Sequence, residues 1–248
     1  MTTKAGPYDQ DYFSSGPYAQ VSFRKYRQYW WSNRFYAKLV LRYGPPSGRA
    51  LEVGCGLGHL VARLSERYQT FGVDMNSWAL DQAKAIAPNA HLALASAEDL
   101  SAIVGGMMDV VVAKHVVEHL PDPGRALAEF SRVLTEHGLL VMATPNLESP
   151  MRMRKGDGWV GYRDPTHVSL LSPREWIGLL EGQALRVTKV FSDGFWDAPY
   201  VAWLPAAFQK LLWGFPGGIQ ALIGYPFLPL RWGESLIILA VKEPNAKR

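Results

Sequence analysis

The run of residues 51–59 constrains the fold of this chain most, because three closely spaced glycines there join an apolar segment to an amphipathic one. The glycines are Gly54, Gly56 and Gly58. Glycine lacks a Cβ, so the backbone can bend sharply and can approach a ligand that any side chain would displace. The helix expected after the turn presents free N–H groups toward that ligand. This pattern is typical of a strand, a binding turn and a helix in an α/β domain.

The rest of the chain alternates short apolar or β-branched runs with helical stretches, as βαβ units around a parallel sheet do. A length of 248 residues and an apolar share of 48% suit one large domain with an appended segment. We predict an α/β fold with a Rossmann-like, seven-stranded, mostly parallel sheet and helices on both faces. The predicted strands are 50–53, 70–74, 91–94, 110–113, 139–144, 186–191 and 235–241, and the predicted helices between them are 57–67, 77–87, 98–103 and 122–134.

Two segments lie outside this minimal fold. Residues 1–45 are aromatic and basic, and we predict an N-terminal helical cap with a helix over 22–41. Residues 46–248 form the α/β domain in this prediction. Within that domain, 146–171 is expected to be an active-site loop, and 194–233 an apolar insertion before the last strand. Between them, the order Ser-Pro-Arg-Glu at 172–175 has the form of a capping box.

The residues around the glycine turn distinguish two classes of ligand. The third glycine comes one residue earlier than in the dinucleotide fingerprint G-x-G-x-x-G. Glu52 would repel a pyrophosphate, but it suits a ligand with an amino group and a sulfonium cation. Asp74 ends the next predicted strand, where a carboxylate can accept both ribose hydroxyls of an adenosine. A structural turn without a ligand, and a helix-capping role for Asp74, are the alternatives.

Several motifs in a fixed order within residues 48–182 resemble the class I S-adenosylmethionine-dependent methyltransferases. The resemblance is strongest to the ubiquinone-biosynthesis O-methyltransferase-like group (methyltransferase type 11), and it implies the Rossmann-like fold and S-adenosyl-L-methionine as cofactor. The motifs are Leu-Glu-Val-Gly-Cys-Gly-Leu-Gly at 51–58, Asp74, Ala-Glu-Asp-Leu at 97–100, Asp-Val-Val-Val at 109–112, Val-Glu-His-Leu-Pro-Asp-Pro at 117–123 and Leu-Leu-Val-Met-Ala-Thr-Pro-Asn at 139–146.

The resemblance also implies a role for individual residues. The turn 54–58 would wrap the methionine part of the cofactor, Asp74 would hold the ribose, and Met75 would flank the adenine. Ser96 departs from the pattern, because many relatives carry an Asp there, so adenine recognition would rest on backbone groups or on Glu98. The expected cofactor-binding residues are Glu52, Gly54, Cys55, Gly56, Gly58, Asp74, Met75, Ser96, Ala97, Glu98 and His115.

Methyl transfer from a sulfonium mainly requires a nucleophile held in line with the S–CH₃ bond. An alcohol or phenol acceptor also benefits from a base, and imidazole titrates near neutral pH. We therefore predict His167 and His119 as catalytic, although His119 could instead bond the backbone at a helix end. Some relatives use an acidic-histidine cluster for a divalent metal. The corresponding places here are His115, Glu118 and His119, with a histidine replacing one acid, so we predict no metal site. Cys55 lies between two glycines and is not expected to be a nucleophile.

The insertion 194–233 contains an uncharged stretch at 211–230. Its prolines and glycines argue against a membrane-spanning helix. Two interpretations stay open: a buried subdomain or homodimer surface, or an apolar lid that receives a lipid-linked acceptor and makes peripheral membrane contact. In the lid interpretation, phosphates of the lipid would be bound by basic side chains, namely Arg152, Arg154, Lys155 and Arg231. A solvated basic loop explains the presence of these residues equally well.

Charge and cysteine usage limit the partners. The net charge of +4 is compatible with anionic substrates or membranes and does not by itself indicate nucleic acid. Residues 113–116 lack the Asn/Asp-Pro-Pro-aromatic run of amino-methylating DNA enzymes, and we predict no nucleic-acid partner. The single cysteine, Cys55, suits a reducing, cytoplasmic compartment, at the inner face of the membrane if the lid contacts lipid.

These observations predict an S-adenosylmethionine-dependent methyltransferase acting on a small-molecule or lipid-like acceptor, by O-methylation through in-line SN2 transfer. The alternatives are N- or C-methylation of a small metabolite, an inactive cofactor-binding scaffold, and an NAD-dependent oxidoreductase.

Overall fold

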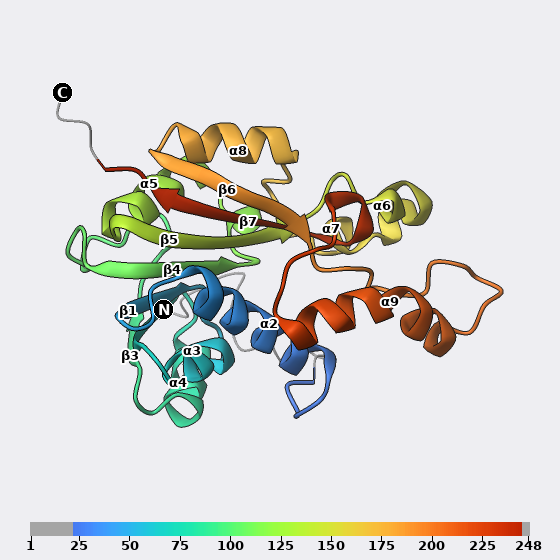
Figure 1. Cartoon of the computed structure of the whole chain (residues 1–248), viewed down its shortest axis with the longest axis horizontal. Coiled ribbons are helices and arrows are strands. Elements are labelled where there is room, and N and C mark those ends of the chain that lie inside the picture. The colour runs from blue at the N-terminus through green and yellow to red at the C-terminus, as the bar shows by residue number, and fades with distance from the viewer. Residues whose placement is uncertain (1–21, 245–248) are drawn as a thin grey trace, which may run out of the picture.

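A seven-stranded sheet forms the centre of the structure, a computed structural model that describes residues 22–244. Its strand order is β3-β2-β1-β4-β5-β7-β6; β1 to β5 run parallel, and β7 pairs antiparallel with both β5 and β6 (Figure 1). All seven predicted strands are confirmed, as is the Rossmann-like, mostly parallel sheet. The strands are β1 (Arg49–Val53), β2 (Gln69–Asp74), β3 (His91–Leu94), β4 (Met108–Lys114), β5 (Leu134–Pro145), β6 (Leu185–Ser192) and β7 (Ser235–Lys242).

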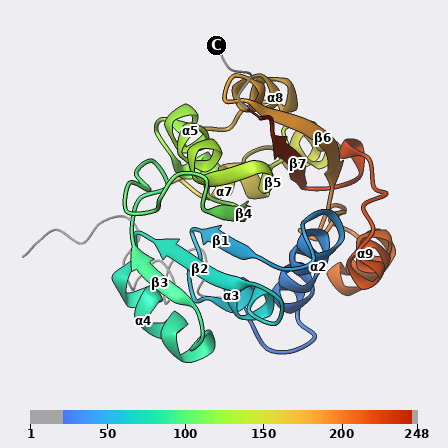
Figure 2. The same ribbon diagram turned by 60° about the vertical axis from the view of Figure 1, so that its left-hand side comes forward.

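Helices cover both faces of the sheet (Figure 2). The helices α2, α3 and α4 lie on one side, and α5 and α8 lie on the other. The central strands are continuous apolar runs because both of their faces are buried. Val111 of β4 packs toward α5 and α8, whereas Val110 and Val112 pack toward α2 and α3. These helices are α2 (Gln28–Tyr43), α3 (His59–Leu64), α4 (Ser77–Ile86), α5 (Pro123–Val133) and α8 (Pro173–Glu181).

Local signals place several helix ends correctly. The Asp122 side chain accepts a hydrogen bond from the Arg125 amide, with a proline at the first position of α5. The capping box predicted at the start of α8 is present, because Ser172 and Glu175 exchange side-chain and backbone hydrogen bonds. The N-terminal helix is also present, beginning at Gln28; the part of the predicted cap before Ser22 lies outside the described residues.

The predicted helix at 98–103 is wrong. This segment forms turns, because side chains of α5 bind the backbone groups that a helix would pair internally. The Leu100 amide donates to Glu129 Oε2 at 2.7 Å, and Arg132 donates to the carbonyls of Leu100 and Ile103. Tertiary hydrogen bonds therefore override the local helical pattern.

The expected active-site loop and the apolar insertion contain more helix than the sequence indicated. Residues 146–171 hold α6 (Pro150–Lys155), the 3₁₀ helix η2 (Gly156–Gly158) and α7 (Val160–Arg163). The insertion holds α9 (Ala206–Ile223) and η3 (Leu230–Trp232), and a further 3₁₀ turn, η1 (Val117–His119), follows β4. Residue Pro216 lies inside α9. Within residues 22–244, no helix is long and apolar enough to cross a membrane.

Candidate functional site

A cavity of about 1690 Å³ opens at the carboxyl edge of β1, β2 and β4. Ligands of open α/β sheets bind at this edge, where the strand order reverses. The glycine turn, the end of β2 and the loop 95–98 line one half of the cavity. His119, His167 and residues of the insertion line the other half. Every predicted site residue lines the cavity except Gly58.

The backbone of the glycine turn explains why glycines stand there. Gly54 has φ of +68°, and a Cβ on it would lie 2.3 Å from Val116 Cγ2. Gly58 has φ of +78° and begins α3, so it shapes the turn without lining the cavity. The amides of Gly54 and Cys55 both donate to the Val73 carbonyl, which ties the turn to β2. Burial raises the pKa of the Cys55 thiol, which agrees with the prediction that Cys55 is not a nucleophile.

Two carboxylates, the half-buried Asp74 and the buried Glu52, bind backbone amides of the glycine turn and of α3. Asp74 accepts hydrogen bonds from the amides of Gly56 at 2.7 Å and Asn76 at 2.9 Å. Burial raises the pKa of Asp74, and these backbone hydrogen bonds oppose the rise. Glu52 accepts from the Val61 amide at 2.9 Å, and burial raises the pKa of its carboxyl group. Both carboxylates face the cavity next to the turn, as predicted for a ligand that carries cations and hydroxyls.

Lys114 is a cavity residue that sequence reasoning missed. Its ammonium group donates to Asn33 Oδ1 at 2.6 Å and lies about 5 Å from the ring centres of Tyr29 and Tyr36. Burial lowers the pKa of Lys114, and the carboxylate of Glu52 opposes that change. One feature of the sequence could have identified Lys114: it ends an otherwise apolar strand. A cation in such a place needs an anionic or aromatic partner.

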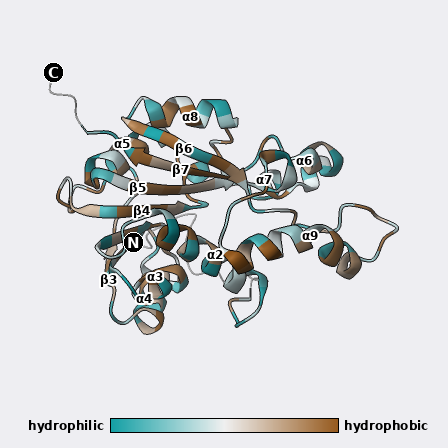
Figure 3. Ribbon diagram, viewed as in Figure 1, coloured by the Kyte–Doolittle hydropathy of each residue, from teal (hydrophilic) through white to brown (hydrophobic). Residues whose placement is uncertain are grey.

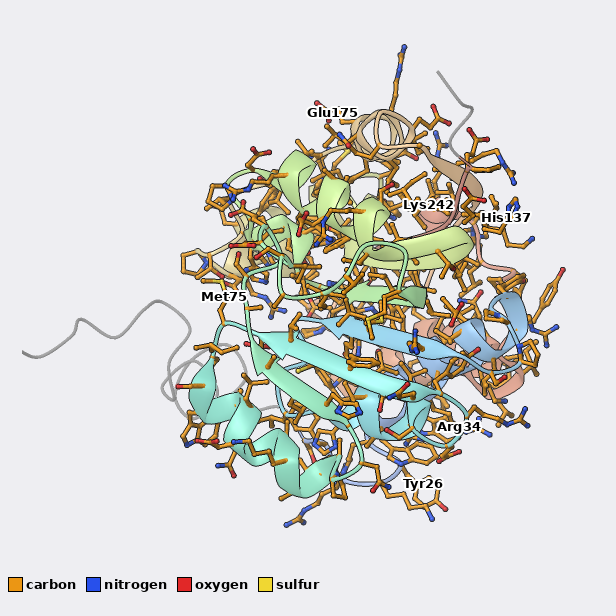
Figure 4. The ribbon with its side chains drawn as sticks, turned by 90° about the vertical axis from the view of Figure 1, so that its left-hand side faces the viewer. Tyr26, Arg34, Met75, His137, Glu175 and Lys242 are labelled. Carbon is orange, nitrogen blue, oxygen red and sulfur yellow. The ribbon has the colours of Figure 1, made fainter. Side chains whose placement is uncertain are left out.

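The predicted adenine edge lies beyond the end of β2. Met75 is exposed there, and Figure 4 labels it at the carboxyl end of that strand. Ser96 Oγ accepts from the Glu98 amide at 3.2 Å, and Glu98 Oε1 accepts from the Asp122 amide at 3.0 Å. The loop carrying Ser96, Ala97 and Glu98 is therefore fixed by its own polar side chains while lining the cavity.

His115 connects the two halves of the cavity through a chain of hydrogen bonds. Its Nδ1 lies 3.0 Å from Glu118 Oε1, and its Nε2 lies 3.3 Å from Ser235 Oγ. Ser235 Oγ in turn donates to Asp193 Oδ2 at 2.8 Å. The φ of His115 is +54°, a conformation that non-glycine residues rarely adopt and that is typical of functional sites. No local pattern identifies Asp193 or Ser235, which reach the site from the end of β6 and the start of β7.

The two predicted catalytic histidines come together on the acceptor side. Their ring centroids are 4.7 Å apart. His167 Nδ1 donates to the Gly161 carbonyl at 2.7 Å, and His119 Nδ1 donates to Thr166 Oγ1 at 2.8 Å, because that hydroxyl already donates to Asp164. These contacts assign the basic lone pair of each neutral ring to Nε2. Burial also lowers the pKa of His119, which favours its neutral form.

Glu118 lies beside the histidine pair and is fully buried. Burial opposes its ionisation, but the hydrogen bond from His115 and the nearby imidazoles outweigh burial, and the pKa of Glu118 is lowered. Its Oε2 has no hydrogen-bond partner among the described residues. Ligand atoms of Glu118, His119 and His167 all lie within 4.8 Å of one another, a grouping suited to a divalent cation. Glu118 and His119 belong to the cluster that the resemblance indicated, but His167 was not expected to join them, and the absence of a metal site stays a prediction.

The basic side chains of residues 152–155 bind other groups of the protein. Arg154 Nε donates to the Tyr200 carbonyl at 2.7 Å, and Lys155 pairs with Asp197. Arg163 of α7 pairs with the same carboxylate at 2.7 Å. These contacts tie α6 and α7 to the insertion, which makes 146–171 a structured wall of the cavity.

In comparisons with known proteins, most of the chain matches one protein family. The family described as "methyltransferase domain" matches residues 23–190. A ubiquinone biosynthesis O-methyltransferase of Caulobacter sp. is 36% identical over 105 residues, covering 40% of this chain and 41% of that protein. A 2-methyl-6-phytyl-1,4-hydroquinone methyltransferase of Synechocystis sp. is 26% identical over 184 residues, covering 68% of this chain and 56% of that protein. The matched segments thus span about half or less of these relatives.

Solved structures share the fold at lower identity. A SAM-dependent methyltransferase from Archaeoglobus fulgidus superposes with a TM-score of 0.59 and 20% identity, covering 87% of this chain and 100% of that chain. At this identity the likeness concerns the fold alone.

Proposed function

The chain belongs to the methyltransferase domain family and has the class I fold that binds S-adenosyl-L-methionine, and on this premise we propose that it methylates an oxygen of a small or lipid-like acceptor. The observation that carries the proposal is the histidine pair. Both histidines line the same cavity as the glycine turn, and each Nδ1 is engaged in a hydrogen bond, so Nε2 is the basic nitrogen of each neutral ring.

The cofactor half of the cavity has charges that complement S-adenosyl-L-methionine. Asp74 lines this half and would accept hydrogen bonds from the ribose hydroxyls. The carboxylate of Glu52 and the ammonium group of Lys114 flank the turn and match the amino and carboxylate groups of the methionine part. These pairings are charge-assisted hydrogen bonds, which are stronger than neutral ones.

Bound cofactor supplies a methyl group on a sulfonium, which leaves as a neutral thioether. The protein must hold the acceptor oxygen in line with that bond and take up its proton. His167 is the proposed base: its Nδ1 is fixed by the Gly161 carbonyl, so Nε2 takes the hydroxyl proton as the new O–C bond forms and the C–S bond breaks. His119 packs against the His167 ring and helps to position it.

The same side chains fit a divalent cation. Glu118 supplies a buried oxygen without a partner among the described residues, and His119 and His167 supply nitrogens within reach. A cation held there would lower the pKa of an acceptor hydroxyl.

The acceptor half of the cavity supports an aromatic or lipid-like compound. Phe195 and Trp196 line it together with small residues of α9. The relatives named for ubiquinone biosynthesis and for a phytyl hydroquinone favour a hydroquinone or catechol with an isoprenoid tail.

Methyl transfer to a panel of prenylated catechols and hydroquinones, followed by mass spectrometry, tests the proposal. We expect His167→Asn to lower kcat by roughly 10²–10⁴-fold, the usual contribution of a general base, with little change in cofactor affinity. His137→Asn is the matched control, because His137 is exposed and Asn tolerates its positive φ.

Two outcomes would contradict the assignment of His167. Turnover of His167→Asn within a few-fold of the parent would remove its role as base. Loss of activity on adding EDTA, restored by Mg²⁺, would assign Glu118, His119 and His167 to a cation instead. No methylated product with any acceptor would favour the inactive scaffold.

A further inference from the structure

Helix α9 exposes its apolar side to solvent, the reverse of the usual surface helix. An amphipathic helix in a soluble protein places its apolar stripe against the core. In α9 the large apolar side chains recur at helical spacing but point outward, with Leu211 exposed to 67% and Phe215 to 61%. Figure 3 shows the hydrophobic colouring along this helix. The exposed stripe consists of Phe208, Leu211, Leu212, Phe215, Ile219, Leu222 and Ile223.

Buried glutamines fix this orientation. Gln209 accepts from the amides of Tyr200 and Val201 and donates to two carbonyls of the preceding loop. Gln220 donates to the Ser192 carbonyl and accepts from the amides of the segment after the helix. Both glutamines are fully buried. Turning the stripe inward would leave these backbone groups unpaired, so the outward apolar face is built into the structure.

The segments that carry the stripe and its basic neighbours contain positive charge and no acidic residues. Residues 22–48 and 198–233 contain no Asp or Glu. Arg34, Lys38 and Arg42 lie one turn apart on α2 and donate to carbonyls at the end of α9. Figure 4 labels Arg34 on this side of the molecule. Trp203, exposed to 83%, precedes the helix, and the exposed Trp232 follows it.

The opposite side of α9 forms a wall of the cavity. Gly214, Gly217 and Ala221 line the cavity and have little or no side chain. The helix therefore separates the acceptor half of the site from the exposed apolar stripe by about one helix diameter.

We propose that α9 lies in the surface of an anionic lipid bilayer, with its apolar stripe among the acyl chains, and that the tail of the acceptor enters the cavity past this helix. Such in-plane helices combine an apolar face, basic neighbours and interfacial tryptophans. The helix does not span the bilayer. The docking surface stands on α9 and α2 alone, whereas the route of the acceptor rests on the proposed function.

A second copy of the chain fits this surface less well. In a two-fold dimer the stripe would meet itself, and the basic side chains beside it would face their own copies. Neither copy would offer a carboxylate from α2 or α9 to compensate them. Anionic head groups supply that negative charge.

Co-flotation of the full-length protein with vesicles tests the docking surface. We expect binding to phosphatidylcholine vesicles that contain phosphatidylglycerol, weaker binding without phosphatidylglycerol, and release at high salt. The double variant Leu211→Gln/Phe215→Gln should bind at least tenfold more weakly. The matched control Leu94→Gln/Met153→Gln changes two exposed apolar side chains elsewhere and should bind like the parent.

Two results would overturn the proposal. One is the absence of co-flotation with either vesicle. The other is equal loss of flotation in the α9 variant and the control. A concentration-dependent dimer that the α9 variant abolishes, without vesicle binding, would assign the stripe to a second copy.

A separate readout distinguishes this proposal from the proposed function. The α9 variant should keep its affinity for S-adenosylhomocysteine, and it should methylate a short-tailed acceptor in water at the parent rate. Its turnover of a long-tailed acceptor in vesicles should fall with its binding. Vesicle binding by a parent protein that methylates no acceptor would leave the docking surface standing and reject the proposed chemistry.

Discussion

Asp74 combines a structural role with a proposed ligand-binding role at the same atoms. Its two oxygens hold the amides of Gly56 and Asn76, and the cavity opens directly beside them. The substitution Asp74→Asn keeps the size of the side chain and removes its charge. Hydrogen bonds to charged groups contribute about 1.5–3 kcal/mol, so we expect S-adenosylhomocysteine to bind roughly 10- to 150-fold more weakly in calorimetry.

The matched control for this prediction is Asp81→Asn. Asp81 is an exposed carboxylate on α4, paired only at the surface with Lys84. This variant removes the same charge and should bind the ligand like the parent. Affinity of Asp74→Asn within threefold of the parent would show that the ribose is held elsewhere.

Residues next to one another in the sequence were predictable, and residues that meet across the sheet were not. The glycines and Asp74 follow from local backbone and charge requirements at the ends of neighbouring strands. Lys114, by contrast, meets Asn33 from 81 positions away, and Ser235 meets His115 from 120 positions away. Nothing local identifies such partners, because each is an ordinary polar residue until the fold places it in the cavity.

At the scale of elements, Gln220 is one of the two buried glutamines that anchor α9 to the protein. Gln220→Leu would leave the Ser192 carbonyl and the amides of Phe227 and Leu228 without their partner. Unpaired buried groups of this kind cost about 1–3 kcal/mol each, so we expect the free energy of unfolding in urea to fall by about 2–5 kcal/mol.

Gln69→Leu serves as the control, because Gln69 is exposed and its two hydrogen bonds are long. It should change the free energy of unfolding by less than about 0.5 kcal/mol. Equal stability of the parent and Gln220→Leu would mean that the buried glutamine does not anchor the helix.

Helices were predicted correctly where the backbone groups find hydrogen-bond partners nearby in the sequence, and wrongly where distant side chains bind those groups. The start of α8 is encoded locally, since Ser172 and Glu175 pair with each other's backbone. The segment 98–103 has a helical pattern, yet Glu129 and Arg132 bind its backbone from α5. In 194–233 the prolines and glycines suggested interruption, but Pro216 is accommodated inside α9.

At the scale of the whole molecule, two-sided burial made the sheet predictable. Central strands such as β4 and β7 must be apolar on both faces, and that requirement is visible as continuous apolar runs. The placement of α9 against α2 was not predictable, because the contact of Arg34 with the Leu222 carbonyl joins positions 188 residues apart. Long-range packing of this kind leaves no periodic trace in the sequence.

The cavity as a whole distinguishes an adenosyl sulfonium from a dinucleotide. Glu52 places a carboxylate next to the turn, where it would repel a pyrophosphate and attract an amino group, whereas Asp74 can hold the adenosine ribose of either ligand. A ligand present at 100 times its Kd stabilises the folded state by about 2.7 kcal/mol. For a chain of this length we expect S-adenosylhomocysteine at that concentration to raise Tm by roughly 5–10 °C, and NAD to leave Tm unchanged. A rise with NAD and none with S-adenosylhomocysteine would favour the oxidoreductase alternative and would contradict the ligand assigned to this turn.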